Sequence, residues 1–196
     1  MDIKVILREI VSTLFTFAIV FAIVWGVQQV ALQPFMVDGH SMDYTLADRE
    51  RLFMWKLGEV DRFDVVIINA PNNPEKMYVK RVIGLPGDTV EVNNDQLILN
   101  GKALDEPYLK AKQDEFNGNF TSDFTLEQIT GSTTVPEGKI FVMGDNRQNS
   151  LDGRNFGFVD IESVVGEANI IYWPLNKMGL LDTYKLNDTG DAIINR

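Results

Sequence analysis

The stretches DVVIINA (Asp64–Ala70) and KMYVKRVIG (Lys76–Gly84) decide the fold class. The first is apolar enough for a buried strand, and the second alternates weakly before it ends at the turn sequence GLPGD. Other short stretches of the same kind, RLFMWK, KIFVMGDNR and VVGEANIIYWP, are separated by turn signals. Many short strands with turns between them predict a mainly β domain, in which antiparallel sheets are folded into a barrel-like shape.

Three further segments complete this prediction. Residues 89–104, TVEVNNDQLILNGKAL, predict a hairpin whose first turn is Asn93–Asp95, followed by an Asn-Gly turn at Asn100–Gly101. Residues 105–136 are polar, so we expect a small, less regular surface insertion there. The tail after Asn176 is also polar, and we expect it to be partly loose.

The N-terminal region is long and apolar, with no charged residue from Ile10 to Val37. A bilayer core needs roughly 20 apolar residues, whereas a cleaved signal peptide usually has an apolar core of about 7–15. We therefore expect a single membrane anchor in residues 1–32 and a β domain in residues 33–196. Lys4 and Arg8 precede the span, and Arg49 is the first basic residue after it. This asymmetry predicts a cytoplasmic N-terminus and an extracytoplasmic domain.

Composition excludes several kinds of function. The chain has 196 residues, a net charge of -10, no cysteine and one histidine. An acidic chain is a poor candidate for binding nucleic acid, which favours a basic surface. The absence of cysteine excludes disulfides and a thiol nucleophile, and one histidine makes a histidine-based metal site improbable. We expect no metal and no cofactor.

A serine nucleophile is suggested by GHSMDYTL (Gly39–Leu46), but its neighbour His40 does not fit the role of base. Adjacent side chains in extended chain point to opposite faces, so we expect His40 to face solvent. Without a second histidine, Ser41 needs another base, and a buried lysine can serve if it is neutral. Lys80 is the candidate, because its strand places it between Tyr78 and Val82 on one face.

A third polar segment, GDNRQNSLDGRNFG (Gly144–Gly157), has two interpretations. It can be a structural loop held by an aspartate–arginine pair. Alternatively, Ser150 can orient the buried lysine while Asp152 and Arg154 pair behind it.

Together, GHSMDYTL, YVKRVIGLPGD and GDNRQNSLDGR resemble, in order, three sequence boxes of the bacterial type I signal peptidases, and the short insertion resembles the Gram-positive type. The resemblance implies a membrane-anchored serine endopeptidase that cleaves signal peptides from exported preproteins. Ser41 would be the nucleophile and Lys80 the general base, supported by Ser150, Asp152 and Arg154. It also implies that Met42, Leu46 and Tyr78 line the first substrate pocket, and that the partners are signal peptides and membrane lipid.

Three positions depart from the family pattern. Tyr44 stands where family members usually have proline, and Gly153 where many have serine. Gly39 stands where some relatives have a hydroxyl that helps to hold the oxyanion, so the backbone N–H of Ser41 is the first expected donor.

Two alternatives remain from the sequence. A catalytically weak or inactive relative could act as a membrane-tethered binding or assembly factor, and Tyr44 is the feature that favours it. A self-cleaving repressor-type peptidase uses a similar dyad, but it needs a DNA-binding head where this chain has its apolar segment.

Overall fold

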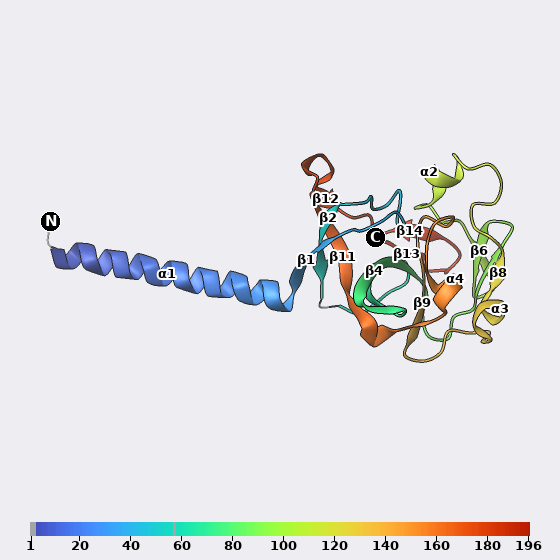
Figure 1. Ribbon diagram of the computed structural model, residues 1–196, viewed down its shortest axis with the longest axis horizontal. Coiled ribbons are helices and arrows are strands. Elements are labelled where there is room, and N and C mark those ends of the chain that lie inside the picture. The colour runs from blue at the N-terminus through green and yellow to red at the C-terminus, as the bar shows by residue number, and fades with distance from the viewer. Residues whose placement is uncertain (1–2, 57) are drawn as a thin grey trace.

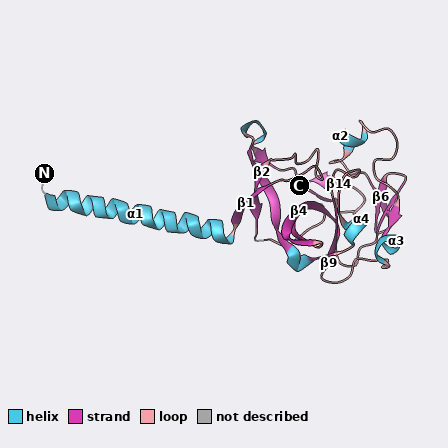
Figure 2. Ribbon diagram, in the orientation of Figure 1, coloured by secondary structure: helices cyan, strands magenta, loops and turns pink. Residues whose placement is uncertain are grey.

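The computed structural model describes residues 3–56 and 58–196, and it shows one long helix attached to a β domain (Figures 1 and 2). The helix is α1 (Ile3–Val30). Its stretch Ile6–Gly26 has 21 residues with a mean hydropathy of 2.0, and none of it is buried against the protein. At about 1.5 Å per residue, such a stretch is long enough for a bilayer core of roughly 30 Å. Length and composition thus agree with the predicted membrane anchor.

The β domain is built around an eight-stranded sheet in the order β1-β2-β11-β3-β4-β9-β10, with β12 paired to β11. All of these pairings are antiparallel. The hydrogen-bonded path runs from β1 to β10 and does not close, so the described strands form a folded sheet rather than a closed barrel. The strands are β1 (Leu32–Met36), β2 (Arg51–Trp55), β3 (Val65–Ala70), β4 (Asn73–Gly84), β9 (Lys139–Met143), β10 (Val159–Asp160), β11 (Val164–Trp173) and β12 (Gly179–Leu180).

Strand β3 explains why its sequence is apolar at consecutive positions. Successive side chains of a strand point to opposite faces. Val65 and Ile67 pack into one buried cluster, while Val66 and Ile68 pack into another. The first cluster also contains residues of the loop between β1 and β2. The central strand therefore supports the segment that carries Ser41.

A second sheet, in the order β7-β6-β5-β8, packs beside the first. Its strands are β5 (Val90–Asn93), β6 (Gln96–Leu99), β7 (Lys102–Leu104) and β8 (Phe124–Thr125). The two predicted turns are present: Asn94 and Asp95 have φ of 49° and 64°, and Asn100 and Gly101 have φ of 53° and 76°. Positive φ at both central residues is typical of the tight hairpin turn that joins adjacent strands.

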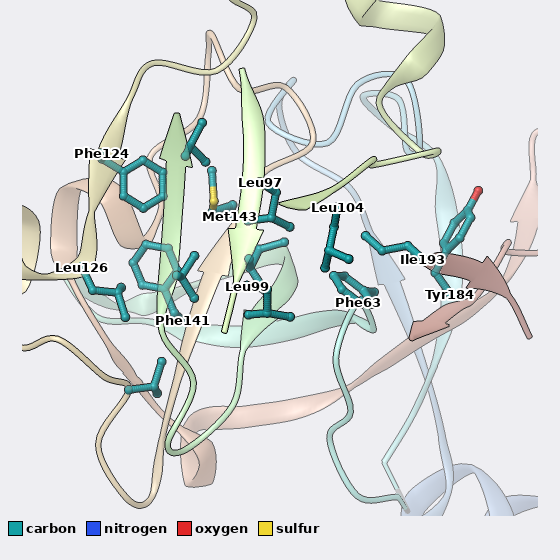
Figure 3. Close-up of a cluster of buried hydrophobic side chains, with 14 residues drawn as sticks. Phe63, Leu97, Leu99, Leu104, Phe124, Leu126, Phe141, Met143, Tyr184 and Ile193 are labelled. Carbon is teal, nitrogen blue, oxygen red and sulfur yellow. The ribbon is translucent and has the colours of Figure 1, made fainter. Parts of the chain in front are cut away.

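The segment 105–136 is more ordered than its polarity predicts. It contains α2 (Lys110–Gln113), β8 and α3 (Leu126–Thr130), and β8 pairs with β5 of the second sheet. Phe124 and Leu126 belong to the main buried cluster shown in Figure 3. The segment is therefore partly buried, because a few of its apolar side chains pack into the core of the domain.

The prediction of a loose tail is wrong. β13 (Tyr184–Leu186) and β14 (Ile193–Asn195) form a two-stranded sheet. Tyr184 and Ile193 are buried in the same cluster as Phe63 and Leu104 (Figure 3). Each strand is only three residues long, too short for alternation to be recognised in the sequence. The remaining short helices are α4 (Gly153–Phe156), η1 (Ile161–Ser163) and η2 (Leu175–Lys177).

Candidate active site

Ser41 lies in the loop between β1 and β2, and its neighbours fix that loop. Gly39 has a φ of 97°, which favours glycine, and its N–H donates to Asp48 Oδ1 at 2.8 Å. The Leu46 N–H donates to the Met42 carbonyl at 2.8 Å. Met42 and Leu46 are 1% and 0% exposed, so their side chains anchor the loop in the core. The serine is thus presented by a loop held at both ends.

Lys80 lies on β4, opposite Val66 of β3, and its side chain is directed at this loop. Its Nζ is 2.7 Å from Ser41 Oγ and donates to the Val79 carbonyl at 2.9 Å. The residue is 2% exposed. Burial lowers the pKa of Lys80 to about 8, while the charges of Asp152 and Asp145 act in the opposite direction. A neutral amine at this distance can accept the serine proton.

The third polar segment follows β9, and the charges of its Asp145, Asp152 and Arg154 act on the Lys80 amine. Asp152 and Arg154 form an ion pair at 2.8 Å, and Asp152 Oδ2 also accepts the Gly144 N–H at 2.9 Å. Burial acts to raise the pKa of Asp152, but the hydrogen bond and charge of Arg154 outweigh it, so this pKa is lowered. Asp152 therefore carries its negative charge near Lys80 at neutral pH.

Ser150 is placed differently from the expectation. Its hydroxyl is buried beside Gly144 and makes no hydrogen bond of good geometry in the described structure, although it is close enough to Asp152 to help lower the pKa of that carboxyl. The expected hydrogen bond from Ser150 to Lys80 is absent. The segment contributes to the lysine instead through the charges of Asp152 and Arg154.

A buried ion pair that was not predicted from the sequence includes Arg81, the residue next to Lys80 on β4. Arg81 donates to Asp145 at 2.9 Å and 2.6 Å, and both side chains are at most 1% exposed. Thr45 Oγ1 donates to the same carboxylate at 2.5 Å, which ties the serine loop to β4 and β9. The only sequence signal was position: Arg81 follows Lys80, and Asp145 is the second residue of the third segment.

Arg147, two residues after Asp145, connects the site to the segment 105–136. Arg147 pairs with Glu106, and both side chains are buried. Arg147 Nε also donates to the Gly144 carbonyl at 3.1 Å. The segment expected to be a surface insertion therefore braces the loop after β9.

The expected pocket residues occupy two environments. Met42 and Leu46 are buried with Val79, so they can form a floor but present almost no surface. Tyr78 is half-buried, with its ring centroid 5.3 Å from Lys80 Nζ and its hydroxyl donating to Asn72. A cavity of about 400 Å³ lies between β2, β3 and β11, but its lining includes neither member of the dyad.

His40 and Tyr44 lie on the outer side of the serine loop. The side chain of His40 is 60% exposed and contacts Asp43 at 3.1 Å, which agrees with the expectation that it faces solvent. Tyr44 is 55% exposed; its hydroxyl bonds Glu115, and Lys112 Nζ lies 4.6 Å from its ring centroid. Tyr44 thus contacts the α2 segment rather than the core.

The chemistry available is that of a serine with a neutral amine beside it. Within residues 3–56 and 58–196, no group of three or more histidine, aspartate or glutamate side chains is arranged to hold a metal ion. Ser41 Oγ can attack a peptide carbonyl as Lys80 takes its proton; the C–N bond then breaks as that proton passes to the leaving amine, and an acyl-serine remains. The acyl group would then be released by water activated at the same nitrogen.

Comparisons with known proteins agree on one family. Residues 7–173 match the family described as signal peptidase, peptidase S26. A signal peptidase I of Bacillus caldolyticus is 49% identical over 73% of this chain and 80% of its own length. Signal peptidase I S of Bacillus subtilis is 45% identical over 82% and 89%, respectively. A crystal structure of a signal peptidase I from Enterococcus faecalis is 47% identical, with a TM-score of 0.54 over 57% of this chain and 97% of that one.

Proposed function

The chain belongs to the signal peptidase family, peptidase S26, and is a serine endopeptidase that cleaves signal peptides; we propose that Ser41 is its nucleophile and Lys80 its general base. The observation that carries this proposal is the distance of 2.7 Å between Ser41 Oγ and the buried Lys80 Nζ. Burial and the lowered pKa favour the neutral amine that proton removal requires. Asp152 and Arg154 are proposed to hold the surrounding loop and tune the charge near the amine.

The substrate is proposed to bind in an extended conformation near β1 and β4, with main-chain hydrogen bonds as in strand addition. The edge position of β1 in the sheet supports this, because an edge strand has unpaired backbone groups. Tyr78 would contribute to the wall of the first pocket and Met42 and Leu46 to its floor.

The protein is membrane-anchored, and we propose that its N-terminus is cytoplasmic and its β domain extracytoplasmic. Lys4 and Arg8 before the span support this orientation. Apolar side chains at η2 and β12 support contact of the domain with lipid: Leu175, Met178 and Leu180 are 68%, 64% and 81% exposed. β12 pairs with β11, and Figure 1 places it at the end of the domain from which α1 leaves.

The dyad is tested with the full chain in detergent and a purified preprotein. Wild type should release the signal peptide, whereas Ser41→Ala and Lys80→Met should not. Ser163→Ala and Lys139→Met are matched controls away from the dyad and should cut at the wild-type rate. If Ser41→Ala cuts as wild type does, the nucleophile is wrong. A wild-type chain that binds the preprotein without cutting it would favour the tethered binding factor.

A further inference from the structure

We propose that Asn146 is a positioning residue for the oxyanion site, because it fixes the peptide group between His40 and Ser41. The inference rests on the proposed role of Ser41 as nucleophile. Asn146 follows Asp145 in the loop after β9 and is 6% exposed. It is more than a hundred positions from Ser41 in the sequence, yet it contacts the serine loop at two places.

The two contacts lie on either side of the nucleophile. Asn146 Nδ2 donates to the His40 carbonyl at 2.9 Å, and the Asn146 backbone N–H donates to the Ser41 carbonyl at 3.0 Å. One residue therefore holds both peptide groups that flank the Cα of Ser41. The His40 carbonyl also accepts a longer bond of 3.3 Å from the Asp43 N–H within the turn.

The first contact bears on the oxyanion. The His40 carbonyl and the Ser41 N–H belong to one planar peptide group, so a bond that fixes the carbonyl also fixes the direction of the N–H. Among the described residues, the Ser41 N–H has no acceptor, so it is free to donate to a substrate. A donor to the carbonyl also polarises the N–H on the other side of the same peptide group. Catalysis benefits when such donors are oriented before the charge develops.

The backbone of Asn146 is itself held on both sides. Asp145 is paired with Arg81, and Arg147 is paired with Glu106, and all four side chains are buried. An amide side chain between two buried ion pairs has little freedom to move with the serine loop. The two buried ion pairs therefore restrict the movement of Asn146 and, through its hydrogen bond to the His40 carbonyl, of the peptide group before Ser41.

The test compares Asn146→Ala with Asn149→Ala, a change to an exposed side chain in the same loop. Full-length proteins in detergent are assayed for kcat and KM on a preprotein between pH 6 and 10, and their unfolding midpoints are measured. We expect kcat of Asn146→Ala to fall about tenfold to a hundredfold, somewhat less than the loss of an entire oxyanion donor. KM and the midpoint of the pH profile should stay unchanged, because among the described residues Asn146 makes no hydrogen bond to Ser41 Oγ or Lys80 Nζ. Asn149→Ala should match wild type.

A second variant covers the case in which Asn146→Ala does not fold. Asn146→Asp keeps the size of the side chain and the backbone bond but removes the Nδ2 donor, so its plateau kcat should fall at least as far. A plateau kcat within about threefold of wild type in either folded variant would overturn the inference, as would a loss confined to KM. If Ser41→Ala cuts as fast as wild type, the proposed nucleophile fails; if Ser41→Ala is inactive and Asn146→Ala cuts as fast as wild type, only the role of Asn146 fails.

Discussion

The titration of Lys80 gives the most direct quantitative test of the dyad. If the neutral amine is the base, the rate follows the neutral fraction of Lys80. With a pKa of about 8, roughly one tenth of the lysine is neutral at pH 7 and roughly nine tenths at pH 9. We therefore expect kcat/KM to rise about tenfold between pH 7 and 9 and then to level off.

A lysine at its ordinary pKa of 10.5 would behave differently. The neutral fraction would rise about a hundredfold between pH 7 and 9 and would still be rising at pH 10. The size of the increase and the presence of a plateau thus separate a desolvated lysine from a solvated one. The assay is kcat/KM on a signal-peptide substrate in steps from pH 6 to 10, with rates taken over minutes to limit inactivation.

The same pKa has a consequence for stability that can be measured without substrate. The folded-state pKa of about 8 lies below the ordinary value of 10.5, so the unfolded chain binds more protons between these values. Wild-type stability should therefore gain at most about 3 kcal/mol from this group as pH rises from 8 to 10.5. Lys80→Met cannot titrate, so the difference between the two free energies of unfolding isolates the effect. A hundredfold rate increase without a plateau, or a difference that does not change with pH, would refute the buried neutral lysine.

Three further substitutions test neighbouring parts of the site. Lys80→Arg should be inactive in the preprotein assay at every pH, because arginine keeps its charge; activity would rule out this base. Gly144→Ala should lower kcat by about a hundredfold, because the new Cβ would overlap Ser150 and the Ser41 carbonyl and displace Ser41; an unchanged kcat would show that the loop can yield. Tyr44→Pro removes only exposed contacts with Lys112 and Glu115, so kcat/KM should stay within about threefold. A large loss of activity or a much lower unfolding midpoint would show that the α2 segment holds the serine loop.

The strands of the sheet were predictable because their signals are local. Asp64–Ala70 is apolar on both faces because β3 lies between two buried clusters, and the turns at Asn94 and Asn100 have the residue types that positive φ selects. The tail was not predictable in this way. Tyr184 lies between Thr183 and Lys185, and Ile193 belongs to the short apolar run Ala192–Ile194. Neither stretch is long enough to show a strand pattern, and both residues are buried only because they pack against the main cluster.

The candidate site, too, was only partly predictable from local sequence patterns. The sequence boxes predicted that Ser41 and Lys80 act together, and the structure places Oγ and Nζ 2.7 Å apart. The sequence motifs did not reveal which contacts bury Lys80 and lower its pKa. Lys80 contacts the Ser41 loop and interacts with the charges of the loop after β9, and Asp145 joins the two loops through the hydrogen bond that it accepts from Thr45. These contacts link positions far apart in the chain, so no local pattern reports them.

Lys80 and Arg81 are neighbours on β4, but their side chains have different electrostatic roles. Arg81 and Lys80 are adjacent and almost equally buried, yet only Arg81 makes a bidentate pair with a carboxylate. The pair stabilises the charge of Arg81, which would otherwise be costly to bury. Among the described residues, Lys80 has a hydroxyl and a carbonyl within hydrogen-bonding distance but no carboxylate, so burial lowers its pKa with no direct ion pair to oppose it. Asp145 thus neutralises Arg81 while it adds only a longer-range interaction to Lys80. The difference between a permanently charged arginine and a titratable lysine is what allows one strand to brace the site and carry the proposed base.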